Sequence, residues 1–291
     1  MARAPVPPAV SAVAGAAYLA ALLAADHFAS RGQQLALGAV TWTVLGAVLV
    51  RSPLAIRVQT LGVVAFATVG EVTGSLIWGV YHYRLHNLPL FVPPAHGLVY
   101  LTGLALATAL RERVRALVAV AAAIAAGWGL AGLTVLPHRD VAGAVGVPLL
   151  LLFLWRSRYR AVYASVFLVV ASLELYGTAL GTWRWERTLP GLGIPDGNPP
   201  SGVASGYVWF DVMALLVAPY GLALAGKRGR SSQQPHAALH PGLAARIHGV
   251  QRPRERPLVG QVENAEPELQ AVPHAELGPD DGAPTVGHAA G

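Results

Sequence analysis

The sequence has no cysteine and little charge. Among its 291 residues there are 0 Cys, and Asp, Glu, Lys and Arg together make up 12%. Without cysteine, the chain has no disulfide, no cysteine-ligated zinc, no iron–sulfur cluster and no covalent c-type haem. A soluble globular domain carries about 25% charged residues. The shortage of charge therefore argues against a soluble protein, which would need far more polar surface.

Hydrophobic residues take the place of charge. They make up 54% of the chain, and the mean hydropathy is +0.49. Long apolar runs recur between residues 10 and 226, and a helix crosses the bilayer core in about 20 residues. The composition therefore predicts an all-α, multi-pass membrane helix bundle. We expect the first apolar run to be a retained helix, because no small-x-small cleavage site ends it.

The apolar runs fit about eight transmembrane helices. We expect them at residues 10–28, 35–50, 58–80, 96–110, 114–136, 141–155, 161–182 and 203–226. A short cytoplasmic N-terminus, residues 1–9, would precede the bundle of residues 10–226. Residues 227–291 are rich in Pro, Gly, Gln, Glu and His. Such a segment buries too little apolar area to offset its ordering entropy, so we expect a disordered cytoplasmic tail.

Basic residues predict how the bundle is oriented. A sequence pI of about 10.0 would suggest nucleic acid for a soluble protein, but here the basic residues cluster between apolar runs. Alternate connections are the richer ones, and they contain Arg51, Arg57, Arg111, Arg113, Arg115, Arg156, Arg158, Arg160, Lys227, Arg228 and Arg230. The positive-inside rule then places both termini in the cytoplasm. Nearly all of this charge is Arg, which is typical of a GC-rich bacterial genome. We expect a bacterial inner-membrane protein whose partner is the lipid bilayer, with no nucleic acid.

A pattern in the first half of the chain recurs in the second. Glu71-x-x-Gly74-Ser75 matches Glu174-x-x-Gly177-Thr178, and each is followed by an aromatic-x-aromatic pair and later by Pro-Pro. The pairs Tyr81-x-Tyr83 and Trp183-x-Trp185 align with a one-residue slip. Since each half would hold four helices, residues 10–110 and 114–226 would form a parallel 4+4 repeat. Chance similarity between apolar segments is the alternative.

Three acids fall inside the expected helices, at similar depth: Glu71, Glu174 and Asp211. An ionisable residue in the membrane is costly unless it is paired or faces water, so it is a functional candidate by default. We expect these three residues to be catalytic, with a neutral carboxylic acid able to donate a proton. The alternative is structural, because the Glu side chains would also hold the two halves together through interhelical hydrogen bonds.

Aromatic and polar residues near the expected outer ends of the helices are the candidates for substrate binding. They are Trp78, Tyr81, Tyr83, Arg84, His96, Trp183, Trp185 and Asn198. An aromatic belt at the membrane interface would also explain the rings. His82 and His86 are four residues apart and, with buried carboxylates, would suit iron or zinc. No complete metal-ligand spacing is present, so we expect no metal and no cofactor.

The same residues carry a resemblance to a known family. Glu71, Gly74 and Gly79 run into Tyr81-x-Tyr83, and Trp183-x-Trp185 precedes the loop Gly193-Ile-Pro-Asp-Gly-Asn198. This pattern resembles the carotenoid biosynthesis membrane proteins that hydrate the ends of acyclic carotenoids, although Pro-Asp-Gly-Asn-Pro-Pro departs from it. The chain is equally similar to a multi-pass integral membrane family of actinobacteria.

The resemblance implies a hydratase that acts on a lipid-soluble isoprenoid. One Glu would protonate a terminal alkene, and a second carboxylate would stabilise the cation and orient water. Two other functions stay open. A transporter or channel for a small solute is favoured by the repeat, and an assembly protein without a small-molecule site would use its outer loops as a contact surface. The oligomeric state is not predicted.

The orientation can be tested by labelling, because the chain has no cysteine of its own. Asn87→Cys lies in an expected outer loop and Arg113→Cys in an inner one. We expect a membrane-impermeant maleimide to label Asn87→Cys in intact cells and Arg113→Cys only after permeabilisation. Labelling of Arg113→Cys in intact cells would overturn the topology.

Overall fold

The computed structural model describes residues 6–231. This part of the chain holds eight α-helices in the expected order: α1 (Pro8–Phe28), α2 (Arg31–Arg51), α3 (Leu54–Glu71), α4 (Val92–Ala109), α5 (Val114–Thr134), α6 (Val141–Arg156), α7 (Arg160–Leu180) and α8 (Val203–Ser231). A 3-10 turn, η2 (Arg111–Arg113), precedes α5. The helix α8 runs past its expected end at residue 226, and the remainder of the predicted tail lies outside the described residues.

The third expected helix differs from its prediction. Instead of one α-helix to residue 80, α3 changes at Glu71 into a π-helix, η1 (Val72–Trp78), which ends at Gly79. A π-helix closes its hydrogen bonds over five residues rather than four, and it is frequently found at functional sites. The irregular segment directly follows the first buried acid.

The helices have the length and composition of membrane spans. Within residues 6–231, five helices are long and apolar enough to cross a membrane: Pro8–Phe28, Arg31–Arg51, Leu54–Trp78, Arg111–Thr134 and Arg160–Leu180. Their outward faces carry large apolar side chains, among them Val13, Leu130 and Leu175. Such extensive apolar exposure suits contact with lipid and not with water. The prediction of a helical membrane protein is confirmed at this level.

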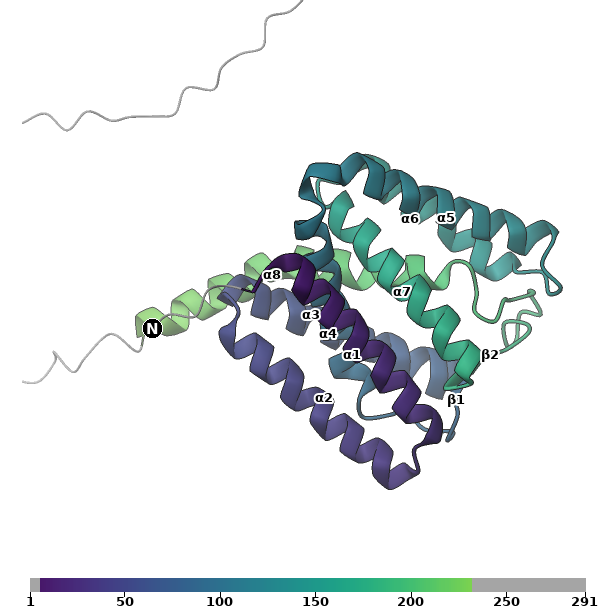
Figure 1. The fold of residues 1–291 in the computed structure, drawn as a ribbon, viewed down its shortest axis with the longest axis horizontal. Coiled ribbons are helices and arrows are strands. Elements are labelled where there is room, and N and C mark those ends of the chain that lie inside the picture. Colours follow the sequence, from purple (N-terminus) through teal and green to yellow (C-terminus); the bar gives the residue numbers. More distant parts are fainter. Residues whose placement is uncertain (1–5, 232–291) are drawn as a thin grey trace, which may run out of the picture. The chain divides into compact units, whose positions relative to one another are not determined.

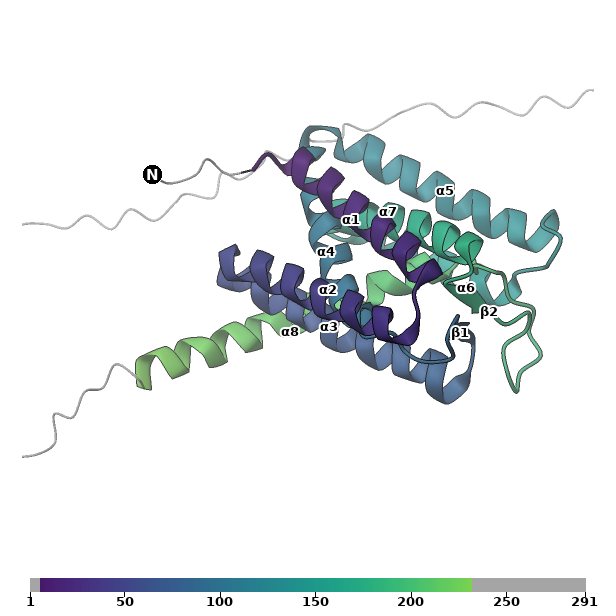
Figure 2. The same cartoon turned by 60° about the horizontal axis from the view of Figure 1, so that its bottom comes forward.

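Helix α4 lies in the middle of the bundle and packs against α1, α2, α3 and α7 (Figures 1 and 2). Glycines allow these close approaches. A Cβ at Gly103 would lie 3.1 Å from the backbone nitrogen of Val166 in α7, and a Cβ at Gly97 would lie 3.0 Å from Val64 in α3. Small residues at crossings are typical of membrane helices, where packing and not water exclusion drives association.

Two short strands join the halves of the bundle (Figure 1). β1 (Tyr81–Tyr83) and β2 (Trp183–Trp185) pair antiparallel, with Tyr81 opposite Trp185 and Tyr83 opposite Trp183. Each strand follows a helix that ends at a glycine in the left-handed region, Gly79 with φ 75° and Gly181 with φ 72°. Because side chains alternate along a strand, all four aromatic rings share one face of this ribbon. The intervening residues of both strands are exposed.

A buried carboxylate fixes the long loop between β2 and α8. Asp140 caps α6 by accepting a hydrogen bond from the backbone nitrogen of Gly143 at 3.0 Å. It also accepts from the backbone nitrogens of Gly197 at 3.0 Å and Ser201 at 2.6 Å. Asp196, beside it, is also buried. Burial, and then the nearby Asp140 carboxyl, raises the pKa of Asp196 to about 7.

Asp196, in this loop, should make the stability of the folded chain depend on pH. The pKa of Asp196 is about 7 in the folded chain, against an ordinary value of 3.8. Between these values the folded state holds a proton that the unfolded state releases, so stability should fall as pH rises through this window and then level off. The thermal midpoint in detergent, followed against pH, measures the slope. We expect Asp196→Asn to flatten it and Glu112→Gln, at an exposed carboxyl, to leave it unchanged. An equal slope in Asp196→Asn and the parent would refute the assignment of this pH dependence to Asp196.

Candidate functional site

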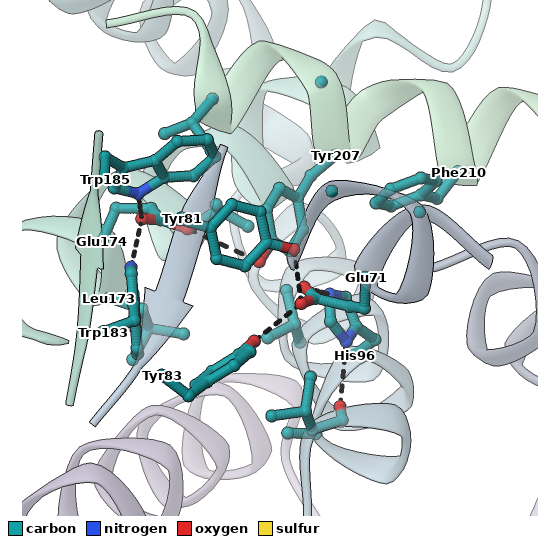
Figure 3. Close-up of a pocket in the computed structure, with 18 of the residues that line it drawn as sticks. Glu71, Tyr81, Tyr83, His96, Leu173, Glu174, Trp183, Trp185, Tyr207 and Phe210 are labelled. Carbon is teal, nitrogen blue, oxygen red and sulfur yellow. Dashed lines mark hydrogen bonds and ion pairs between the residues drawn. The ribbon is translucent and has the colours of Figure 1, made fainter. Parts of the chain in front are cut away.

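A cavity of about 520 Å³ lies between the helices and the aromatic ribbon. Most of its wall is apolar and comes from α1, α4, α7 and α8, including Leu19, Leu22, Val99, Val170 and Phe210. Its polar groups are Glu71, Tyr81, Tyr83, His96, Glu174, Trp183, Trp185 and Tyr207, and Figure 3 shows them facing one another. The two glutamates therefore belong to one site, although they come from different halves of the chain.

Glu71, near the end of α3, is held by two phenols from β1. Its Oε2 accepts hydrogen bonds from the Tyr81 hydroxyl at 2.6 Å and the Tyr83 hydroxyl at 2.7 Å (Figure 3). Its Oε1 lies 3.3 Å from Nε2 of His96. Since Glu71 is 6% exposed, these protein groups replace the water that would otherwise solvate the carboxyl.

The hydrogen bonding of His96, in the first turns of α4, shows which of its ring nitrogens carries a hydrogen. Its Nδ1 lies 2.9 Å from the carbonyl oxygen of Val92. A carbonyl can only accept, so Nδ1 carries a hydrogen. Nε2 is then the ring atom that gains or loses a proton, and it faces Glu71 without a well-aligned hydrogen bond. Nε2 is thus the ring atom through which His96 contacts Glu71.

Glu174, in α7, has a different set of donors. Its Oε2 accepts hydrogen bonds from the indole nitrogens of Trp183 at 2.9 Å and Trp185 at 3.3 Å. The Tyr207 hydroxyl lies 3.5 Å from its Oε1. The ring of His96 stacks on Tyr207 with centroids 5.1 Å apart. Tyr207 therefore contacts both Glu174 and His96. Every hydrogen-bond donor to Glu174 is a neutral group.

The glycine of each Glu-x-x-Gly motif makes room for an aromatic ring. A Cβ at Gly74 would lie 2.9 Å from Cε1 of Tyr81, and a Cβ at Gly177 would overlap the six-membered ring of Trp183. Each glycine lies three residues after its acid and hence on the same helix face. The ring can then cross the helix and reach back to the carboxyl.

The cavity reaches the side of the bundle beside the π-helix. Thr73 and Trp78 line the cavity, and both are exposed. The Trp78 indole donates a hydrogen bond to the carbonyl of Pro190 at 3.0 Å, which fixes the ring at this opening.

The structure gathers most of the predicted site residues and separates three. The cavity is lined by Glu71, Glu174, Trp78, Tyr81, Tyr83, His96, Trp183 and Trp185. Asp211 is buried in α8 but does not line this cavity. Arg84 donates hydrogen bonds to the carbonyls of Asp26 and Ala29, at the end of α1. Asn198 accepts one from the backbone nitrogen of Trp185 at 3.0 Å, so it positions β2 from outside.

Two residues of the site, Tyr207 and Phe210, were not predicted to be part of it. Both come from the first turns of α8 and line the cavity beside His96. In the sequence, Tyr207 is an aromatic residue near an expected interface, which an aromatic belt also explains. Its spacing from the predicted Asp211 gives no usable signal, because Asp211, four residues later, lies outside the cavity.

Metal ligands do not cluster in the part of the chain that the structure describes: no group of three or more His, Asp or Glu there could hold a metal ion. Comparisons with protein-family models, curated proteins and solved structures found no match. The function of the site therefore has to follow from its own geometry.

The close approach of ring and helix can be tested with matched glycines. Gly177→Ala would push Trp183 away from Glu174, and overpacking of this kind costs about 1–3 kcal/mol. Gly206→Ala is the control, because Gly206 also lines the cavity but has no neighbouring atom within 4 Å of its would-be Cβ. We expect a lower free energy of unfolding in mixed micelles for Gly177→Ala alone. Equal values for both variants would contradict the packing argument.

Proposed function

We propose that this protein is a membrane enzyme that adds water across a terminal carbon–carbon double bond of a lipid-soluble isoprenoid. The observation that carries the proposal is that two buried carboxyls, Glu71 and Glu174, line the same cavity. The rest of the wall of this cavity is mostly apolar. The resemblance to the acyclic carotenoid hydratases points to the same substrate class and the same reaction.

The cavity suits one end of an isoprenoid chain. Its volume of about 520 Å³ lies within the range of about 300–1,000 Å³ that is typical of small-molecule sites. A polyene end has no polar group, so Leu22, Val99 and Val170 would hold it by apolar contact alone. The rest of a long chain would pass Trp78 into the bilayer. The substrate would therefore enter from the membrane.

We assign the proton donor to Glu174. Its hydrogen-bond partners are neutral indoles and a phenol, whereas Glu71 faces His96. Two carboxyls in different environments commonly divide acid and base roles. In the first step the Glu174 proton would bond to the terminal carbon, the π electrons would form that C–H bond, and a tertiary cation would remain at the next carbon.

Glu71 and His96 would complete the reaction. The cation would be stabilised by the nearby carboxylates and by the faces of the aromatic rings. A water oxygen would bond to the cationic carbon, and its released proton would pass to the Glu71–His96 pair. Return of a proton to Glu174, by way of Tyr207, would restore the starting state. The net change is the addition of one water, with no oxidant or reductant.

We infer further that the two halves are a parallel repeat. The support is local: α3 packs on α8 as α7 packs on α4, and each Glu is bonded by the aromatic pair of the strand that follows it. The one-residue slip also has a physical account. Gly79 follows Glu71 by one residue more than Gly181 follows Glu174, and the π-helix accommodates the additional residue.

A parallel repeat implies that all eight helices cross the bilayer. We propose that α4, α6 and α8 span together with the five helices that have the length and composition of membrane spans, with both termini in the cytoplasm of a bacterial inner membrane. The basic clusters support this orientation. The aromatic ribbon and the cavity would then lie toward the outer side.

Transport is the less favoured function. A solute pathway needs polar groups along its length, and most of the cavity wall is apolar. The third predicted acid, Asp211, does not extend the polar part of the cavity. A pocket with its polar groups gathered together and a lateral opening fits chemistry on a lipid better than passage of a solute.

The proposal is tested by pigment and polyprenyl profiling of a deletion strain that expresses variants from a plasmid. We expect Glu174→Gln, Glu71→Gln and His96→Gln each to lower product by about 10²–10⁴-fold, because each removes a proton-transferring group. The control is Glu112→Gln, an exposed carboxyl on η2. Asp211→Asn decides whether the acid outside the cavity takes part; we expect nearly full activity.

Each variant must be present in the membrane and elute as the parent does in size-exclusion chromatography. Well-folded Glu71→Gln and Glu174→Gln proteins that leave the lipid and pigment profile at the parental level would rule out the enzyme proposal.

A further inference from the structure

A second cavity, of about 420 Å³, lies beside the outward-facing side of β2. Its wall is built from the end of α5, from α7, from β2 and from the long loop that Asp140 anchors. Trp185 lines both this cavity and the apolar one. The two spaces are therefore neighbours, but their chemistry differs.

Basic groups dominate the polar part of this second cavity. Arg184, Arg187 and His138 line it, together with a single acid, Asp196. Within residues 6–231, the side chains of Arg184 and Arg187 make no hydrogen bond or ion pair. Neither guanidinium is thus held by another side chain or carbonyl of the described residues. An Arg guanidinium presents a planar fork of donors that matches phosphate oxygens.

The remaining wall is apolar. Trp128, Leu136 and Leu175 line the cavity, and they belong to or directly follow the apolar helices α5 and α7. A free anion in water would gain nothing from such a wall. An anionic group attached to a hydrocarbon chain would use both parts, with its charge on the arginines and its chain against the bundle.

We propose that this cavity is a binding site for the phosphate group of an anionic membrane lipid, held by Arg184 and Arg187. The site is independent of the hydration reaction, because the arginines do not line the apolar cavity. Basic residues near the end of a membrane helix attract anionic headgroups in general. Two arginines beside an apolar wall would make this attraction selective for an anionic phosphate that is attached to a hydrocarbon chain.

The test uses the full chain in phosphatidylcholine nanodiscs, with phosphatidic acid as the probe and bound lipids counted by native mass spectrometry. We expect phosphatidic acid to bind in preference to phosphatidylcholine. Arg184→Gln and Arg187→Gln should each weaken its binding about tenfold, since each removes a guanidinium that would donate charge-assisted hydrogen bonds to the phosphate. Arg139→Gln is the matched control: it removes the same charge from a nearby exposed residue that does not line the cavity.

Competition with inorganic phosphate distinguishes a site for a lipid headgroup from a site for the phosphate group alone. Displacement of phosphatidic acid by millimolar inorganic phosphate would support a site for the phosphate group alone, and resistance to it would support a lipid headgroup site. Equal binding of both lipids by the parent, or equal losses in Arg139→Gln and Arg184→Gln, would overturn the proposal. Glu174→Gln should bind phosphatidic acid normally, so the two proposals can fail separately.

Discussion

A carboxyl group buried between membrane helices has to be hydrogen-bonded by the protein itself, because lipid offers it no partner. This chain meets that need at Glu71 and Glu174, with aromatic O–H and N–H groups. The buried Asp211 in α8 is the exception, because its Oδ2 has no hydrogen-bond partner among the described residues. The side chains of the two strands provide those aromatic groups. The strands turn back over the helix ends at Gly79 and Gly181, and each sends alternate rings toward the acid of its own half.

The same rings shape the cavity. Phenols and indoles use their polar edges to bond the carboxyls, and their faces form part of an apolar wall. The acids are therefore close to apolar space without being solvated by water, which strengthens every electrostatic interaction there. An acid solvated by water would lose most of that effect. The aromatic side chains that stabilise the two buried carboxyls therefore also place them next to a space that an apolar ligand could occupy.

The sequence predicts the helices, the two glutamates and the aromatic pairs, because hydrophobic runs and short motifs encode depth and order along the chain. It does not encode which way a helix is turned. The sequence predicts Asp211 at the depth of the two glutamates, yet Asp211 lies off the cavity, while Tyr207, one turn earlier, lines it. Long-range contacts are equally invisible: Arg84 bonds the end of α1, and Asn198 bonds β2, because the folded loops bring them there.

The difference between the two glutamates matters more than their likeness. Similar helix ends and strands surround both acids, but phenols bond Glu71 where indoles bond Glu174, and His96 faces only Glu71. A symmetric site would give two equivalent carboxyls that compete for one proton. Here the different donors and the single histidine make the two carboxyls inequivalent. The proposed division into an acid and a base rests on that asymmetry, because two carboxyls in different environments can take different roles.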